Sequence, residues 1–332
     1  MKIIRNFIIF FIFLFSSSVH SNDHSFSGWL KSFKKTALKN DISEKTFNKT
    51  MLNVKFLPKV IEYDRFQPEF YEDTITYITK RSSKKKLEKG INFYLENKVL
   101  INSIGKKFFV EEELLLALMA IETNYGSYVG KMDILSSLAT LSFDKRRSAF
   151  FTNELITILQ LVEKGIIDHK ILYGSWAGAF GNFQFMPTTI KKYAIDYNSN
   201  NIIELHNLED SFASAANYIN KMGWEKNKPC FAKIKLSKKI PMKFLNTSAK
   251  NIKNKKKLSY FKKYIINFEE LDINKNLTTA IITPDKEIVE NSNKLSPAYL
   301  IFDNYELILK WNRSLRFALA VCTLKDKFTN EL

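Results

Sequence analysis

Cysteine is scarce in this sequence of 332 residues, which contains two, Cys230 and Cys322. With no histidine at ligand spacing they make no metal site, and whether they form one disulfide in an oxidising compartment is left open by the sequence. After residue 21 no apolar run reaches the roughly 20 residues that a membrane-spanning helix needs. There is also no internal repeat and no low-complexity region beyond a bias towards Lys and Asn, so a repeat architecture is not indicated.

Acidic residues are outnumbered by basic ones, with 34 Asp and Glu against 51 Lys and Arg and a net charge of +17. Such an excess can indicate an anionic partner, but Lys, Asn, Ile and Phe are abundant together, a bias that A/T-rich coding gives regardless of function. The runs Lys84–Lys86 and Lys255–Lys257 are predicted to be solvated loops. No nucleic-acid-binding signature accompanies them, so we expect no nucleic acid partner, whereas an acidic wall polymer is compatible with the charge.

The first 21 residues have the pattern of an export signal. Lys2 and Arg5 precede the apolar run Phe7–Phe15, and small residues follow up to Ser21, where we expect cleavage. About 310 residues then remain, enough to bury a sizeable core without disulfides. Because no cysteine lies near the cut, we expect no lipid anchor and predict a soluble, exported protein.

Helical periodicity dominates the chain up to Trp224. Apolar residues at intervals of three and four predict helices over five segments. These are Phe26–Lys39, Ser43–Asn53, Leu87–Phe108, Ala149–Lys164 and Asp210–Met222. Between the second and the third, Pro58 and Pro68 punctuate a stretch that we predict to be extended.

Beyond residue 225 the pattern changes to short β-type runs. Ala232–Leu236 alternates, and Thr278–Thr283 and Tyr299–Asp303 are β-branched or aromatic runs bounded by turn residues. We therefore predict a small β-rich subdomain over 226–304, followed by a C-terminal helix at Tyr305–Thr323. The predicted fold class is α+β, mainly α.

One carboxylate, Glu122, stands at the end of the apolar stretch Leu114–Gly126. The residues three, four and seven positions before it are Met or Leu, so helical spacing puts the acid on a buried stripe. Burial, and the negative end of the helix dipole beside a helix stop at Gly126, should raise the pKa of Glu122 so that it holds a proton near neutrality. The alternative is a buried glutamate paired with a Lys or Arg elsewhere in the core.

The segment Gly174–Pro187, GSWAGAFGNFQFMP, is a loop rich in glycine and aromatic residues. Glycines at this density let the backbone approach another group closely. A plain flexible linker would leave Trp176, Phe180, Phe183 and Phe185 exposed, so we expect an ordered loop. One protonated carboxyl beside such a loop, in an exported and mostly helical protein, is typical of a glycan-cleaving site of the lysozyme type.

Four segments resemble, in order and spacing, the successive motifs of the lytic murein transglycosylase B family. They are Ala120–Gly126 (AIETNYG), Lys131–Arg147 (KMDILSSLATLSFDKRR), Gly174–Pro187 and Asn217–Trp224 (NYINKMGW). The similarity covers most of the mature chain and is strongest over Leu114–Trp224. Four linked motifs are a far more specific signal than any one alone.

The resemblance implies a lysozyme-like helical core over 109–225, after the signal 1–21 and a helical N-terminal region over 22–108. The β-rich subdomain would be an insertion before a C-terminal helix, 305–332, that closes on the core. The resemblance implies a periplasmic enzyme that acts on peptidoglycan glycan strands and requires no cofactor. We expect this enzyme to be a monomer. It cleaves the β-1,4 bond between N-acetylmuramic acid and N-acetylglucosamine and leaves a 1,6-anhydromuramoyl end. Glu122 would be the acid and then the base, so no second carboxylate is needed.

Further positions match residues of the family's substrate site one by one. They are Tyr77, Ser175, Gln184, Tyr218 and Asn312. The sequence departs from the family at Trp311 and Phe317, where tyrosines are usual. Two hydroxyls are lost at these positions. The aromatic rings can still stack on the substrate, but hydrogen bonding at the distal subsites is put in doubt.

Arg146 and Arg147 match a basic pair of the family that could bind carboxylates of the substrate. The alternative is a structural pair to Glu154 or Asp144.

The loop Asp196–Asp210 resembles the family's calcium loop. Its candidate oxygen donors are Asp196, Asn198, Asn200, the carbonyl of Ile202 and Asp210. Two of the side chains are neutral amides, and Asn201 stands where a glycine would ease the turn, so any calcium site should be weak and structural. An Asn-rich turn closed by hydrogen bonds without metal is the alternative.

Two other functions remain open. A hydrolase on the same fold would need a positioned water and usually a second carboxylate roughly 5–10 Å from the first. Asp133 and Asp144 are the nearby candidates, but both fit helix or turn caps better. A non-catalytic peptidoglycan-binding protein is the third hypothesis, which the presence of Glu122 disfavours.

Overall fold

The structure is a computed structural model that describes residues 25–66, 72–286, 289 and 293–332. The predicted export signal and Pro68 lie outside the described residues. Within them, no helix combines the length and the apolar character needed to cross a membrane. The chain forms two compact units, of which the first takes the described residues of 1–66, 129–192 and 198–205, and the second those of 67–128, 193–197 and 206–332. The segment 109–225, predicted as one core, thus contributes to both units.

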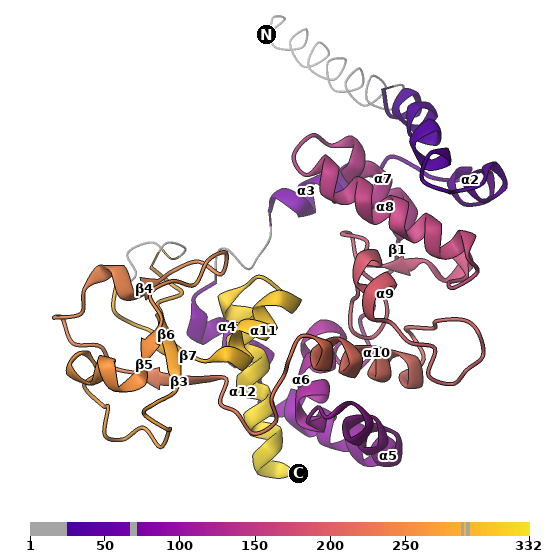
Figure 1. Ribbon diagram of the computed structural model, residues 1–332. Helices are drawn as coiled ribbons and strands as arrows, with labels where there is room; N and C mark the ends of the chain where they lie inside the picture. Colours follow the sequence, from indigo (N-terminus) through magenta and orange to yellow (C-terminus); the bar gives the residue numbers. More distant parts are fainter. Residues whose placement is uncertain (1–24, 67–71, 287–288, 290–292) are drawn as a thin grey trace, which may run out of the picture. The chain divides into compact units, whose positions relative to one another are not determined.

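The first unit is helical apart from one short antiparallel pair, β1 (Met132–Asp133) with β2 (Tyr173–Gly174). Residues 25–38 are helical. The other helices are α2 (Glu44–Met51), α3 (Pro58–Arg65), α7 (Ile134–Phe143), α8 (Ser148–Glu163), the 3-10 turn His169–Ile171 and α9 (Pro187–Tyr193), whose last residue belongs to the second unit. The helices α7 and α8 pack side by side, with α3 against α7 (Figure 1).

The second unit is built around α6 (Glu112–Thr123). The surrounding helices are α4 (Thr74–Arg81), α5 (Lys84–Phe108), α10 (Leu208–Lys221), α11 (Asp303–Trp311) and α12 (Leu315–Glu331). Of these, α5, α10 and α12 contact α6 directly (Figure 1). Every residue from Leu114 to Ala120 is at most 1% exposed, so α6 is buried on all sides.

A small sheet completes the second unit. Its strands are β3 (Phe231–Ile234), β4 (Leu245–Asn246), β5 (Lys256–Lys257), β6 (Thr278–Ile282) and β7 (Ala298–Ile301), with 3-10 turns at Met242–Phe244 and Leu258–Tyr264. The order is β3-β7-β6-β4, and β5 pairs with β6. The β4–β6 pair is parallel and the others are antiparallel. Phe244, Phe261 and Leu300 are in its hydrophobic core.

A disulfide, which the sequence had left open, joins Cys230, just before β3, to Cys322 of α12, with a Cα–Cα distance of 6.1 Å. It ties the edge of the sheet to the helix that packs on α6. The predicted fold class, mainly α with a small β part, is confirmed.

Three local predictions were wrong. The stretch expected to be extended contains α3 and α4, because Pro58 occupies the first turn of a helix, where its missing N–H costs nothing. The two lysine runs predicted as loops are in regular elements: Lys84–Lys86 is the first turn of α5, capped by Ser83, and Lys256–Lys257 form β5. The expected single C-terminal helix is divided into α11 and α12 at Asn312–Ser314, where Ser314 caps α12.

Candidate active site

Glu122 lies in the last turn of α6, at the point where the helix leaves the core. Its side chain is half-buried, whereas Met119 and Ala120 are at most 1% exposed. The spacing had suggested a buried stripe on one side of the helix and a solvent-exposed face on the other. The structure shows no such exposed face over Leu114–Ala120. It ends at Asn124 (φ 50°), two residues before the predicted stop, and Tyr125 (φ 59°) and Gly126 (φ 74°) continue in the left-handed region.

Two lysines of α5 bind the C-terminal end of α6. Lys86 Nζ donates to the carbonyl oxygen of Ala120 at 2.6 Å. Lys89 Nζ donates to the carbonyl oxygen of Asn124 at 2.8 Å and to Ser127 Oγ at 2.6 Å. Burial lowers the pKa of Lys86 below its ordinary value. Two cations at the negative end of the dipole oppose one of the two effects expected to raise the pKa of Glu122, and that raised pKa stays a prediction.

Glu122 is contacted by Trp311, which is the last ring in a stack of three aromatic side chains. Trp311 Nε1 donates to Glu122 Oε1 at 3.0 Å. The Trp311 ring stacks on Tyr218, with centroids 5.0 Å apart and planes 25° apart, and Tyr218 stacks on Tyr193 at 4.3 Å and 26°. Burial, and secondarily Tyr193, raises the pKa of Tyr218 to about 12, so its hydroxyl stays protonated.

The sequence did not single out Tyr193 as a site residue and did not assign a donor role to Trp311. Asn217 helps to hold Tyr193 in place, because Asn217 Nδ2 donates to the Tyr193 backbone carbonyl oxygen at 2.8 Å.

Asn312 follows Trp311 as the C-cap of α11 and is half-buried. Phe317, the other position where the resemblance implies a tyrosine, is 3% exposed within α12. The chain thus has a hydrogen-bond donor at Trp311, where the resemblance implies a tyrosine hydroxyl.

The loop at Gly174–Pro187 is ordered, as predicted. Phe180, Phe183 and Phe185 are at most 3% exposed, and Trp176 is half-buried. Ser175 Oγ accepts a hydrogen bond from Ala179 N at 3.1 Å, so it shapes the turn.

Gln184 is also part of this loop, in the left-handed region at φ 49°. Its amide nitrogen donates to the carbonyl oxygens of Val129, at 3.1 Å, and Gly181, at 3.0 Å. Because both amide hydrogens are directed at the backbone, the predicted binding role of Gln184 falls to its carbonyl oxygen.

Arg146 and Arg147 share a structural partner that is neither Glu154 nor Asp144. Both guanidinium groups bind Asp64 of α3, which is 2% exposed, at 2.5 and 2.9 Å between N and O atoms. Glu154 accepts from Thr188 instead, and Asp144 pairs with Arg65 at 2.8 Å. The expected structural ion pair is therefore made with Asp64. Both arginine side chains nevertheless remain at least 40% exposed.

Tyr77, in α4, is 1% exposed, and the guanidinium of Arg81 lies 3.5 Å from its ring centroid. Its role as a substrate contact stays a prediction. The two carboxylates considered for a hydrolase are caps, as expected: Asp133 Oδ1 accepts from Ser136 N at 2.6 Å at the start of α7, and Asp144 follows its last residue.

The residues of the predicted calcium loop divide between the two units, with Asp196 and Asp210 in the second and Asn198, Asn200 and Ile202 in the first. Side-chain oxygens of Asn198 and Asn200 accept from backbone N–H groups at 3.2 and 2.9 Å. Asp210 Oδ1 accepts from Tyr197 N at 2.8 Å.

Asn201 has φ 71°, the conformation that a glycine would ease. Among the described residues, no group of three or more His, Cys, Asp or Glu gathers where it could hold a metal ion. Two of the five candidate donors are neutral amides that already accept backbone hydrogen bonds, and Asp210 is engaged with Tyr197 N, so the residues do not fit a strong calcium site.

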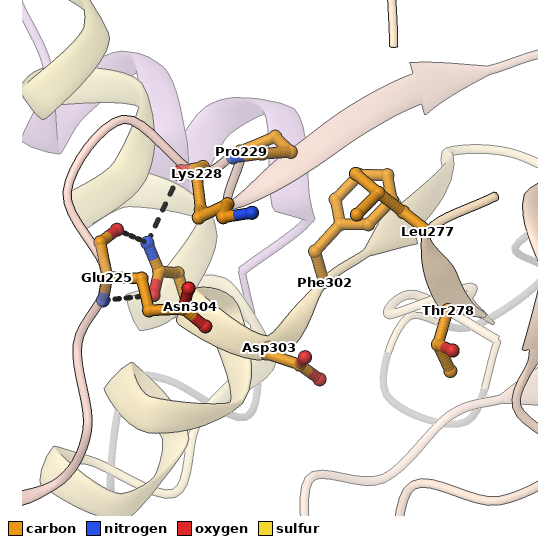
Figure 2. Close-up of a pocket in the computed structure, with 8 residues that line it drawn as sticks. All are labelled: Glu225, Lys228, Pro229, Leu277, Thr278, Phe302, Asp303 and Asn304. Carbon is orange, nitrogen blue, oxygen red and sulfur yellow. Dashed lines mark hydrogen bonds between the residues drawn. The ribbon is translucent and has the colours of Figure 1, made fainter. Parts of the chain in front are cut away.

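A cavity of about 60 Å³ lies in the second unit, at the loop after α10 and the starts of β6 and α11 (Figure 2). Asn304 closes one wall: its Nδ2 donates to the carbonyl oxygens of Glu225, at 2.8 Å, and Lys228, at 3.3 Å. The volume suits a few water molecules and not a sugar ring. Glu122 is not among its lining residues, so this cavity is separate from the candidate acid.

The mainly helical fold and the half-buried Glu122 agree with the family that the four motifs imply. Residues 25–326 match the family model of the transglycosylase SLT domain, and the chain belongs to that family. The membrane-bound lytic murein transglycosylase B of Escherichia coli K12 is 36% identical over 141 residues, which are 42% of this chain and 39% of that protein. The resemblance inferred from the four motifs is confirmed.

Solved structures agree with this assignment. SltB3 from Pseudomonas aeruginosa, in complex with NAG-NAM-pentapeptide, superposes with a TM-score of 0.80 at 27% identity, covering 92% of this chain and 79% of that one. The Escherichia coli lytic transglycosylase Slt35, in complex with calcium, has a TM-score of 0.74 over 91% of this chain and 93% of its own. At 23% identity, it shows the shared fold alone.

Proposed function

We propose that this chain is a peptidoglycan lytic transglycosylase that cleaves the β-1,4 bond between N-acetylmuramic acid and N-acetylglucosamine. The observation that carries the proposal is the carboxylate of Glu122, half-buried at the end of a helix whose residues Leu114–Ala120 are buried, and bound by the indole N–H of Trp311. Membership of the transglycosylase family supports it, as does the complex of the related SltB3 with a NAG-NAM peptide.

In the proposed reaction Glu122 first donates its proton to the glycosidic oxygen, and the bond to the muramoyl anomeric carbon breaks. As a carboxylate it then takes the proton of the muramoyl C6 hydroxyl while that oxygen attacks the anomeric carbon. The 1,6-anhydro ring closes, the proton returns to Glu122, and no water is consumed. The acetamido group of the substrate helps to stabilise the intermediate. One group that alternates between acid and base is therefore sufficient.

The substrate contacts belong to the same proposal. The hydroxyls of Ser175 and Tyr218, the carbonyl oxygen of Gln184 and the amide of Asn312 are suited to the N-acetyl and hydroxyl groups of the glycan. The exposed parts of Arg146 and Arg147 are suited to its carboxylates. Tyr77 completes the set as a residue of the substrate site. We further propose that the protein works as a monomer in the periplasm, after removal of the export signal.

The experiment is mass spectrometry of the soluble products released from peptidoglycan sacculi by the purified mature protein. Anhydromuramoyl ends, lighter by one water than reducing ends, are expected. Glu122→Gln should abolish release, by about a thousandfold or more, because the amide cannot transfer a proton, while the melting temperature stays within a few degrees of the wild type. Arg146→Gln, which leaves Glu122 in place, is the companion variant and should retain the same product ends.

Reducing muramic ends would contradict the proposal and indicate a hydrolase with a second carboxylate. Asp133 and Asp144 are poor candidates for it, since each is engaged at an end of α7. Binding to sacculi without any release would indicate a binding protein. Release that persists in Glu122→Gln would remove Glu122 from the mechanism.

A further inference from the structure

We infer that Trp311 is a positioning residue for Glu122, whose donor-only indole N–H keeps Oε1 of the carboxyl as the hydrogen-bond acceptor and assigns the transferred proton to Oε2. The inference rests on the proposed function, because it describes how the acid of that reaction is held. It starts from the 3.0 Å contact between Trp311 Nε1 and Glu122 Oε1.

The indole ring is fixed by its neighbours. Tyr218 stacks on it and Tyr193 stacks on Tyr218, with centroid distances of 5.0 and 4.3 Å. Tyr218 also donates from its hydroxyl to the carbonyl oxygen of Lys310, the residue before Trp311, at 3.3 Å. Trp311 stacks on a tyrosine that is itself hydrogen-bonded to the backbone beside Trp311, so the position of the indole N–H is set before any substrate binds.

The chemistry of the donor decides what this contact does. An indole nitrogen has a hydrogen to give and no lone pair to accept with, whereas a tyrosine hydroxyl can do either. Tyrosine, usual in the family at this position, would tolerate a proton on either carboxyl oxygen. Trp311 favours the form in which Oε1 carries no proton. It also stabilises the ionised carboxylate, which is the form that must accept the proton of the C6 hydroxyl.

Other charged and titratable groups on the helices of this unit set the background for the contact. From α5, Lys86 and Lys89 bind the last carbonyls of the helix. On α10, Tyr218 stays neutral, since its pKa is about 12. On α11, Lys310 is exposed beside Trp311. On α12, Arg316 is paired with Asp285 at 3.0 Å. The lysines favour the carboxylate whichever oxygen carries the proton, whereas the indole N–H acts on Oε1 in particular.

The first test needs neither substrate nor turnover. The protein has four tryptophans, so a ¹H–¹⁵N spectrum of labelled protein contains four indole signals, and Trp311→Phe identifies the one of interest. We expect the Trp311 indole signal to titrate with the pKa of Glu122 and to lose that titration in Glu122→Gln. The matched control is Trp224, whose indole donates to Glu111 at the other end of α6, and whose signal should ignore Glu122→Gln. An indole signal of Trp311 that does not follow Glu122 overturns the inference.

The second test is kinetic, on soluble glycan strands prepared from peptidoglycan. Trp311→Phe keeps an aromatic ring and removes the donor, so kcat should fall about tenfold or more while KM stays within about twofold. The alkaline limb of the kcat/KM profile should move to higher pH, since the lost bond favoured the ionised form. Trp311→Tyr, which restores a donor, should recover part of kcat.

A loss confined to KM would make Trp311 a substrate platform and overturn the inference, as would an unchanged kcat and pH profile in Trp311→Phe. Failure of the proposed function is distinguishable from these outcomes. A wild-type protein that releases no anhydromuramoyl ends would refute the lytic activity, while the coupled titration of Trp311 and Glu122 would still report whether the indole governs that carboxyl.

Discussion

Lys86 of α5 and Ala120 of α6 are joined by a hydrogen bond from the ammonium nitrogen to the carbonyl oxygen, at 2.6 Å. The Ala120 carbonyl also accepts from Asn124 N, at 3.1 Å, where the helix stops. A half-buried cation thus holds the helical turn that carries Glu122. The end of α6 is stabilised from a second helix, and its negative dipole is opposed by a formal positive charge.

Lys86→Met should therefore lower stability and raise the pKa of Glu122. The expected cost is about 1–2 kcal/mol, since one of the two hydrogen bonds to the Ala120 carbonyl and a favourable interaction with the helix dipole are lost together. The measurements are the melting temperature and the alkaline limb of the kcat/KM profile, which should move to higher pH. Lys85→Met removes the same charge from an exposed neighbour and should change neither. Equal effects in both variants would mean that only net charge matters.

Glu154→Gln should alter the pH dependence of stability. Burial raises the pKa of Glu154, which is 1% exposed, above its ordinary value. The folded state then binds this proton more tightly than the unfolded state, so the stabilisation is present below the ordinary pKa and is lost as pH rises through the raised one.

The Glu154→Gln protein should gain stability relative to the wild type at pH 8 and lose that advantage near pH 4, as measured by urea unfolding. Glu163 is the opposite case, because hydrogen bonds from Thr46 and Ser43 lower its pKa. Glu163→Gln should therefore lower stability at pH 8. The same direction of change in both variants would contradict the assignment.

Tyr218→Phe and Ser175→Ala should each reduce turnover by about one to two powers of ten if both hydroxyls bind the glycan, as lost hydrogen bonds of about 1–3 kcal/mol would do. Tyr218→Phe also loses the bond to the Lys310 carbonyl, so a modest drop in melting temperature is expected with it. Initial rates on soluble glycan strands measure both effects. Tyr260→Phe, at an exposed tyrosine on the sheet side, is the control. Wild-type rates in both variants would remove the two residues from the site.

Calcium should have little effect on the protein. The candidate loop offers neutral amides that already accept backbone hydrogen bonds. With a dissociation constant near 1 mM, 1 mM calcium would add about 0.4 kcal/mol, and the melting temperature would move by about 1–2 °C. Scanning calorimetry in 1 mM calcium and in EDTA measures this. A rise of 5 °C or more would reveal a strong site.

Local patterns in the sequence were sufficient for much of the fold. The helices α2, α5, α8 and α10 lie within a few residues of the predicted segments, because an amphipathic repeat and a capping residue are local signals. Asp133 was recognisable as a cap for the same reason. The helices α3 and α4 escaped prediction because Pro58 and Pro68 favour an extended stretch, although a proline in the first turn is compatible with a helix.

By itself, the sequence determined the family, the mainly helical class and the candidate acid, because these depend on residue types at fixed spacing along the chain. The tertiary structure decided which groups meet Glu122 and its helix: Trp311 is 189 residues away in sequence, Lys86 is 34 residues from Ala120, and Cys230 pairs with Cys322 across 92. Hydrogen bonds, ion pairs and disulfides depend on distances of a few ångströms, and spacing along the chain does not fix such distances between separate helices.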